Sequence, residues 1–99
     1  MIRHVVSWKL VAEDAAAQEL AATEIVNALE ALPAVIPEIV SLQVGRNIAH
    51  PDSNWDLVLI ADFASLDDIE TYHVHPDHQK VIALVRARVS ARSAVDFEL

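Results

Sequence analysis

The chain has 99 residues, of which 54% are hydrophobic, and its formal net charge at pH 7 is −8. This length and composition are those of one small folded domain, and the acidic balance argues against nucleic acid as a partner, because phosphate binding needs clustered Lys and Arg. The absence of cysteine excludes disulfides, thiolate metal sites and cysteine nucleophiles.

Residues 1–10 form too short and too interrupted an apolar stretch for a signal peptide. No apolar run approaches the roughly 20 residues of a membrane span, so we expect no membrane partner and a soluble cytoplasmic protein. The hydrophobic content is high for so short a chain, which indicates that part of the surface is buried against a partner.

Residues 2–10 alternate between an apolar and a more polar face, which is the pattern of a strand. His4 lies on the apolar face, where a lone histidine is either a satisfied core residue or part of a pocket. Residues 13–32 change to the helical period and carry one apolar stripe. Pro33 ends this predicted helix.

Residues 38–49 alternate again and predict a second strand, in which Gly45 indicates a bulge or a close backbone approach. Residues 50–54 are rich in turn formers, and residues 55–63 predict a third strand. The short polar link makes these two strands a hairpin.

Two helical pieces are predicted in the second half of the chain. Ser65 opens a capping sequence for a helix that runs to about residue 72, and Pro76 suits the first turn of the next helix. Near the end of that helix lies a local basic stripe, which complements the helix dipole, made of Arg86, Arg88 and Arg92. Residues 93–99 alternate and predict a final strand.

The resulting order is β-α-β-β-α-β, with the second helix broken in two. This order predicts an α+β, ferredoxin-like fold with a four-stranded antiparallel sheet, in a single domain over residues 1–99. Helices on one face of such a sheet leave its other face bare. A second copy of the same sheet is the simplest cover for that face, so we expect a homodimer.

The stretch from Tyr72 to His78 holds three of the five histidines and the only tyrosine. His78 falls in the first turn of a predicted helix, whose positive end disfavours imidazolium, so a neutral ring could act as a general base. Tyr72 could donate a hydrogen bond to a carbonyl oxygen and stabilise an enolate. Alternatively, the two side chains bond to each other or to backbone and lock the break between the helices.

His75 precedes Pro76, where its side chain could satisfy free backbone N–H groups of the helix. If residues 72–75 were extended, His73 and His75 would point the same way and could bind a metal with His78. That spacing is not the spacing of a standard zinc site, so we expect no functional metal. No Gly-rich phosphate loop or flavin motif is present, and we expect no cofactor.

Four stretches of the chain together resemble the Dabb family, the stress-responsive dimeric α/β-barrel proteins. They are Ile2-Arg3-His4-Val5-Val6, residues 55–63, Ser65-Leu66, and Tyr72-x-x-His75-Pro76-x-His78. The resemblance covers nearly the whole chain in element order. It implies a homodimer in which two sheets face each other and form an α/β barrel.

The family includes a plant polyketide cyclase, and the resemblance implies which residues line the pocket. The catalytic tyrosine and histidine of that cyclase correspond to Tyr72 and His78, and a pocket histidine corresponds to His4. Two further pocket positions differ, because this chain has Asn27 in place of a tyrosine and Leu57 in place of a histidine. The candidate substrate-binding residues, including an aromatic side chain that could stack on a flat ligand, are His4, Trp8, Leu57 and His75.

The sequence therefore predicts a pocket protein for a small apolar or aromatic molecule. Its leading function is that of a cofactor-free cyclase, lyase or isomerase with His78 as base and Tyr72 as oxyanion donor. One alternative is a non-catalytic, stress-associated dimeric binding protein. Another is a cofactor-independent oxygenase of phenolic substrates.

Overall fold

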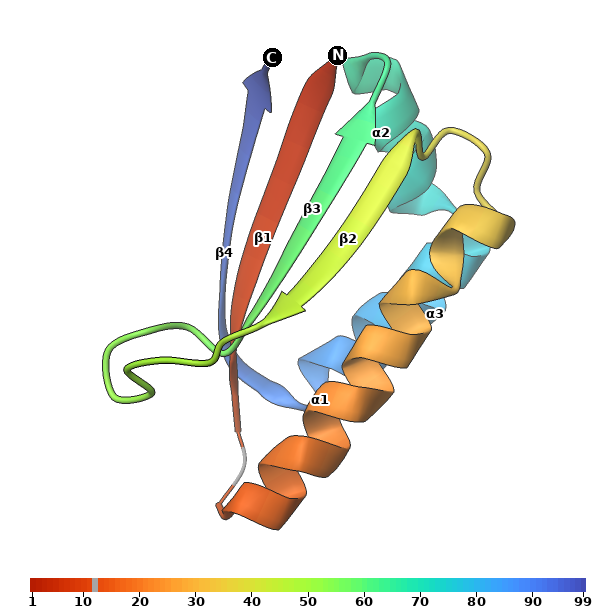
Figure 1. Cartoon of the computed structure of the whole chain (residues 1–99). Coiled ribbons are helices and arrows are strands. Elements are labelled where there is room, and N and C mark those ends of the chain that lie inside the picture. Colours follow the sequence, from red (N-terminus) through yellow and green to blue (C-terminus); the bar gives the residue numbers. More distant parts are fainter. Residues whose placement is uncertain (12) are drawn as a thin grey trace.

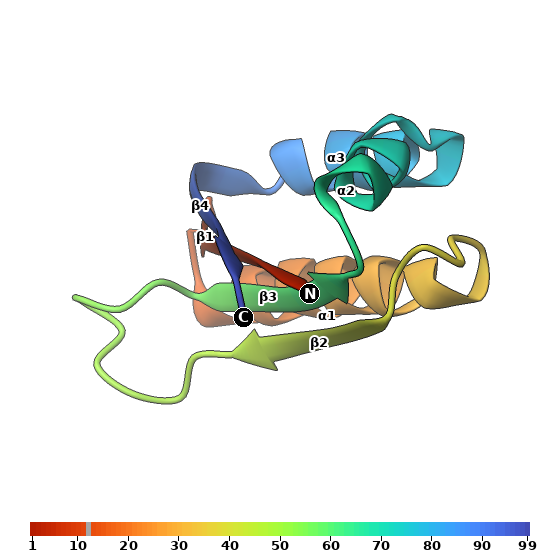
Figure 2. The same ribbon diagram turned by 90° about the horizontal axis from the view of Figure 1, so that it is seen from above.

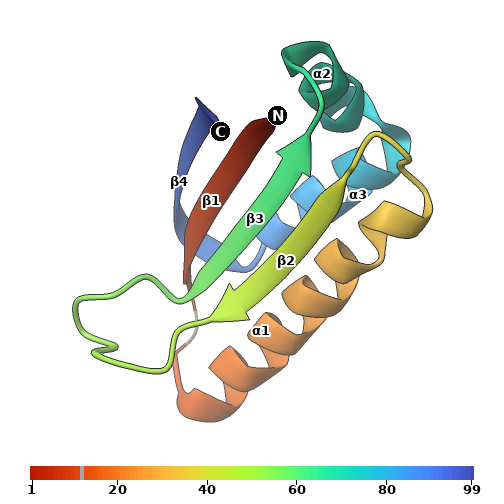
Figure 3. The same cartoon turned by 45° about the horizontal axis from the view of Figure 1, so that its top comes forward.

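The computed structural model describes residues 1–11 and 13–99 as one antiparallel sheet with helices on one of its faces (Figures 1 and 3). The strands follow the spatial order β2-β3-β1-β4, with β1 at Ile2–Leu10, β2 at Ser41–Arg46, β3 at Leu57–Phe63 and β4 at Val89–Glu98. The helices are α1 at Ala15–Glu30, α2 at Leu66–Val74 and α3 at Pro76–Arg86, with a short 3-10 turn at Leu32–Ala34. None of the helices in the described residues is both long and apolar enough to cross a bilayer.

The predicted order β-α-β-β-α-β and the ferredoxin-like fold are confirmed. Seen from above, the sheet is twisted and α2 continues into α3 across a bend (Figure 2). Local sequence explains the helix ends: the Asp14 carboxylate accepts the Ala17 N–H, and the Ser65 hydroxyl accepts the Asp68 N–H. Pro76 is the first residue of α3, as expected.

Three of the predicted strands had wrong boundaries. The second strand covers only Ser41–Arg46 within the predicted residues 38–49, and the third begins at Leu57, so that Trp55 lies outside the sheet with 37% of its surface exposed. The final strand begins at Val89, four residues earlier than expected. The early part of this strand is held by pairing with β1, as far as Leu10 opposite Val89. The local sequence there has no alternating pattern that would indicate a strand.

Gly45 forms no bulge, and the group that lies close to its backbone is a side chain. A Cβ atom at this position would lie 3.2 Å from Val58 Cγ1 on the neighbouring strand. The irregularity in the sheet register lies elsewhere, between Lys9 and Leu10 on β1.

The face of the sheet that packs on the helices forms the core. On β1 the alternation holds as predicted, since His4, Val6 and Trp8 are buried on this face. β3 contributes the next row of buried side chains, and α1 covers them with Ile25 and Leu29. His4 is only 4% exposed and therefore lies inside this core.

The opposite face of the sheet carries apolar side chains, and none of the helices in the described residues covers it. Val5 lies opposite Ile60 on β3 and opposite Val95 on β4, so three aliphatic side chains form a row across three strands. Val95 is 61% exposed. At the edge of this row Arg3 donates two hydrogen bonds to the Asp62 carboxylate, at 2.9 and 3.0 Å. Such an apolar, uncovered strand face is unusual for a protein that stays monomeric.

Candidate functional site

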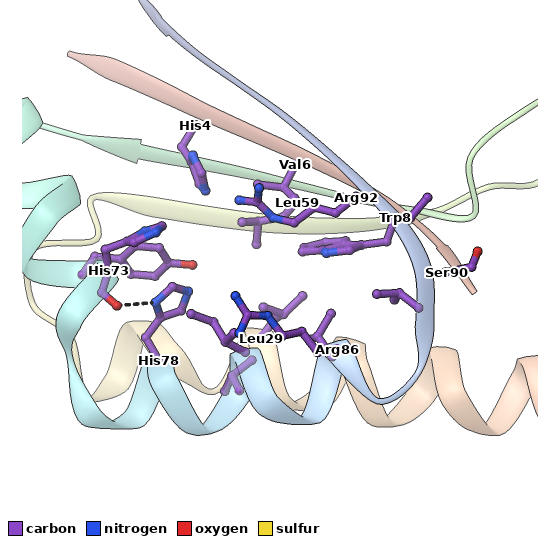
Figure 4. A pocket seen from close by; sticks show the side chains of 16 residues that line it. His4, Val6, Trp8, Leu29, Leu59, His73, His78, Arg86, Ser90 and Arg92 are labelled. Carbon is purple, nitrogen blue, oxygen red and sulfur yellow. Dashed lines mark hydrogen bonds between the residues drawn. The ribbon is translucent and has the colours of Figure 1, made fainter. Parts of the chain in front are cut away.

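A cavity of about 380 Å³ lies between the helix-covered face of the sheet and α3 (Figure 4). This volume is in the range of small-molecule sites, roughly 300–1,000 Å³. Eight of its 16 lining residues are aliphatic. The chemically active side chains among its lining are His4, Trp8, Tyr72, His73, His78, Arg86 and Arg92.

His78 reaches the cavity from the first turn of α3 and is only 7% exposed. Its Nδ1 lies 3.2 Å from the backbone carbonyl oxygen of His73, the contact drawn in Figure 4. A carbonyl can only accept, so Nδ1 carries the hydrogen and Nε2 holds the free lone pair. Burial lowers the pKa of His78 below its ordinary value. The ring is therefore neutral near pH 7, as the sequence predicted, with burial as the main cause.

Tyr72 lies against His78, from the last part of α2. The two ring centroids are 3.9 Å apart and the ring planes are inclined by 30°. The Tyr72 hydroxyl makes no hydrogen bond within the described residues. Every fully buried side-chain N or O atom in those residues has a hydrogen-bond partner, so this hydroxyl is not fully buried. It is therefore open to the cavity that Tyr72 lines. Burial raises the pKa of Tyr72 to about 12. The phenol thus stays protonated and can donate.

His4 approaches the same place from β1. Its ring lies edge-on to Tyr72, with centroids 6.1 Å apart. Its Nδ1 contacts the carboxylate of Asp96, which lies directly opposite on β4, and this contact leaves Nε2 as the ring nitrogen available to the cavity. Sequence reasoning missed Asp96, because only the pairing of β1 with β4 brings the two residues together.

The remaining candidate residues divide in two. Trp8 lines the cavity, whereas Leu57 is buried in the core beyond its lining and His75 lies outside it. The His75 Nδ1 accepts the Asp77 N–H at 3.1 Å and so caps α3, the structural alternative considered above. Leu57 and His75 were expected to line the pocket, but neither lines this cavity.

Two arginines were missed as pocket residues. Arg86 lies in the last turn of α3, as the interpretation of a helix-end complement expected, but it also lines the cavity. Arg92 was interpreted in the same way, but it lies in β4, opposite Trp8 on β1. Arg92 therefore lies on the same face of the sheet as Trp8 and lines the cavity with it. The early start of β4, which local sequence does not indicate, is the reason for the error.

The metal interpretation depended on an extended stretch at residues 72–75, but that stretch is helical as far as Val74. His75 then uses Nδ1 as a cap. Across residues 1–11 and 13–99, no group of three or more His, Cys, Asp or Glu side chains is arranged to hold a metal ion.

The family model of the stress responsive A/B barrel domain, Dabb, matches residues 2–99. The chain belongs to the Dabb family. A comparison with curated proteins gives no significant match.

Solved structures agree with this assignment. A dimeric protein of unknown function from Bacteroides fragilis is 30% identical, with a TM-score of 0.90 over 99% of this chain and 95% of that chain. A dimeric ferredoxin-like protein from Thermobifida fusca, also 30% identical, has a TM-score of 0.84 over 99% and 90%. A hydroxynitrile lyase from Passiflora edulis shares the fold, with a TM-score of 0.81 over 97% and 90% of the two chains, but is only 12% identical.

The cap of α3 leads to a first prediction for this Dabb protein. Replacing His75 by Ala removes the acceptor for the Asp77 N–H and should lower the free energy of unfolding by about 1 kcal/mol, measured by urea denaturation. Ser65→Ala, which removes the corresponding acceptor at α2, is the matched comparison and should cost a similar amount. Unchanged stability of His75→Ala would show that this cap contributes nothing.

A second prediction concerns acid stability. The folded-state pKa of His78 is lowered, so the unfolded chain binds a proton more readily than the folded one as the pH falls through about 6.5, the ordinary value. The contribution of His78 to stability is therefore complete above that pH and is lost below it.

Thermal melts at pH 7.5 and 5.5 measure this loss. His78→Gln, which keeps a side-chain donor but does not titrate, should lose less stability between the two pH values than the unchanged protein. An equal loss in both proteins would contradict the buried, neutral histidine.

Proposed function

We propose that this Dabb protein is a cofactor-free enzyme, a cyclase, lyase or isomerase, that removes a proton next to a carbonyl group of a small, partly apolar substrate. The observation that carries the proposal is the stacked pair of His78 and Tyr72 on the wall of one cavity. One ring is a neutral base and the other a protonated donor, and these are the two groups that enolate chemistry requires.

In the proposed step, His78 Nε2 accepts the proton of the carbon α to the carbonyl group. The electron pair of the broken C–H bond moves into the enolate, and the Tyr72 hydroxyl donates a hydrogen bond to its oxygen. The carbonyl of His73 holds the Nδ1–H of His78, so the ring has one fixed tautomer. The enolate then adds to a second carbonyl carbon, and the alkoxide formed takes the proton from His78. Alternatively, it expels a leaving group from the β carbon, which takes that proton, or it regains the proton from His78 at another carbon.

Proton exchange tests this proposal without knowledge of the natural substrate. The protein is incubated in D₂O with 2-oxo-4-phenylbutanoate, and loss of the C3 proton signal is followed by NMR. We expect exchange faster than with the same concentration of free imidazole. No catalysed exchange with this acid, or with a panel of related ketones, would contradict the enzyme proposal.

We also propose that the protein is a homodimer in which a second copy covers the bare face of the sheet. The row of Val5, Ile60 and Val95 supports this, because an exposed aliphatic row is stabilised by burial. Two solved relatives of 30% identity are described as dimeric, which supports a dimer here. Two such sheets facing each other make the α/β barrel.

A second candidate is a non-catalytic dimeric binding protein whose motif has a structural role. The observation in its favour is that the His73 carbonyl accepts from both His78 and Gln79, the latter at 2.6 Å, so these contacts join the end of α2 to α3. In that case His78→Gln and Tyr72→Phe should alter stability and leave no catalysed exchange to lose.

A further inference from the structure

The charges around the cavity differ from those of the whole chain. The sequence has 15 Asp and Glu against seven Lys and Arg. Nevertheless, no Asp or Glu is among the residues that line the cavity, whereas two arginines are. The protein as a whole has a net charge of −8, so the cavity wall is positive because of the positions of these two arginines.

Ion pairing separates the five arginines into two groups. Three of them hold carboxylates, in the pairs Arg3–Asp62, Arg46–Glu19 and Arg88–Glu24, with N–O distances between 2.6 and 2.9 Å. Within residues 1–11 and 13–99, neither Arg86 nor Arg92 forms an ion pair or a side-chain hydrogen bond. The two guanidinium groups without an acidic partner in the described part of the chain are thus the two that line the cavity.

Both groups are directed at the same space. Figure 4 shows the guanidinium ends of Arg86 and Arg92 pointing into the cavity, one from α3 and the other from β4. Arg92 is close enough to the Tyr72 hydroxyl that its charge opposes the rise of the tyrosine pKa. The positive charge therefore borders the stacked pair of Tyr72 and His78.

We infer that Arg86 and Arg92 bind the carboxylate of the ligand, and that the cavity takes organic acids with an apolar or aromatic body. A guanidinium group presents a planar fork of donors that matches a carboxylate. With the carboxylate held there, the keto group of a 2-oxo acid lies on the side of Tyr72, and Trp8 and the aliphatic wall face the body. The inference deepens the proposed function, but it concerns binding and is measured without turnover.

A matched pair of ligands tests the inference. 2-Oxo-4-phenylbutanoate and 4-phenylbutan-2-one share the same phenyl-ethyl ketone and differ by a carboxylate in place of a methyl group. Isothermal titration calorimetry should show at least about tenfold tighter binding of the acid, because hydrogen bonds to a charged group are worth about 1.5–3 kcal/mol. The preference should weaken at high salt.

Two arginine variants locate the site. Arg92→Gln, alone or with Arg86→Gln, should weaken binding of the acid by about 10- to 100-fold and leave binding of the neutral ketone unchanged. Arg46→Gln removes the same charge from an exposed ion pair away from the cavity, and it should bind both ligands like the unchanged protein. Melting temperatures confirm that the variants remain folded.

The outcomes separate this inference from the proposed function. Equal affinity of the unchanged protein for both ligands, no binding of the acid, or undiminished binding of the acid by the folded double variant would each overturn the carboxylate site. Binding of the acid that depends on Arg92, without any proton exchange, would support the carboxylate site and contradict the enzyme proposal.

Discussion

Replacing His78 by Ala should lower the rate of catalysed proton exchange by about 10²- to 10⁴-fold, the usual contribution of a positioned general base. The reason is that burial keeps the His78 ring neutral, while the His73 carbonyl holds its Nδ1–H, so that Nε2 presents a lone pair beside Tyr72. The rate is measured by NMR in D₂O with 2-oxo-4-phenylbutanoate.

Tyr72→Phe keeps the ring stacked against His78 and removes only the hydroxyl that opens to the cavity. We expect a loss of about 10²- to 10³-fold in the rate, as for removal of one oxyanion donor, with binding of the acid largely retained. Since the hydroxyl has no partner among the described residues, the folded state should lose little stability.

His75→Ala is the matched control for the histidine variant. It is the same substitution three residues earlier, at a side chain that caps α3 and does not line the cavity. It should exchange protons at nearly the unchanged rate despite its lower stability. If His78→Ala and His75→Ala lost activity equally, the losses would reflect the helix break and not a base.

The largest structural effect is expected from a charge on the bare face of the sheet. Val95→Asp should convert the proposed dimer to a monomer, because a carboxylate would replace an aliphatic side chain directly opposite Val5. Burying an unpaired carboxylate in an interface costs several kcal/mol, more than a small dimer can absorb. Light scattering at micromolar concentration should give a mass near 10.9 kDa in place of twice that value.

Leu20→Asp is the control for this change. Leu20 is also an exposed aliphatic residue, 63% accessible against 61% for Val95, but it lies on α1 and not on the sheet. This variant should remain a dimer. A dimeric Val95→Asp protein, or a monomeric unchanged protein, would contradict the facing-sheet arrangement.

Local sequence determined the order of the elements and the bend between α2 and α3. Alternation on β1 placed His4 on the buried face, and Pro76 located the start of α3, because side-chain period and proline geometry act within a few residues. The same local rules put His78 in the first helical turn. They also placed His75 beside the cap, where it now accepts a hydrogen bond.

Only the tertiary structure decided which residues surround the bend between α2 and α3. The contact of His4 with Asp96 and the position of Arg92 both depend on the register of β4 against β1, across about 90 residues of sequence. No alternation pattern contains that register, because it arises from pairing between distant strands. For the same reason, the sequence wrongly placed Leu57 in the pocket and missed Arg86 and Arg92. In the structure, Leu57 is buried in the core, and packing of α3 on the sheet places both arginines on the cavity wall.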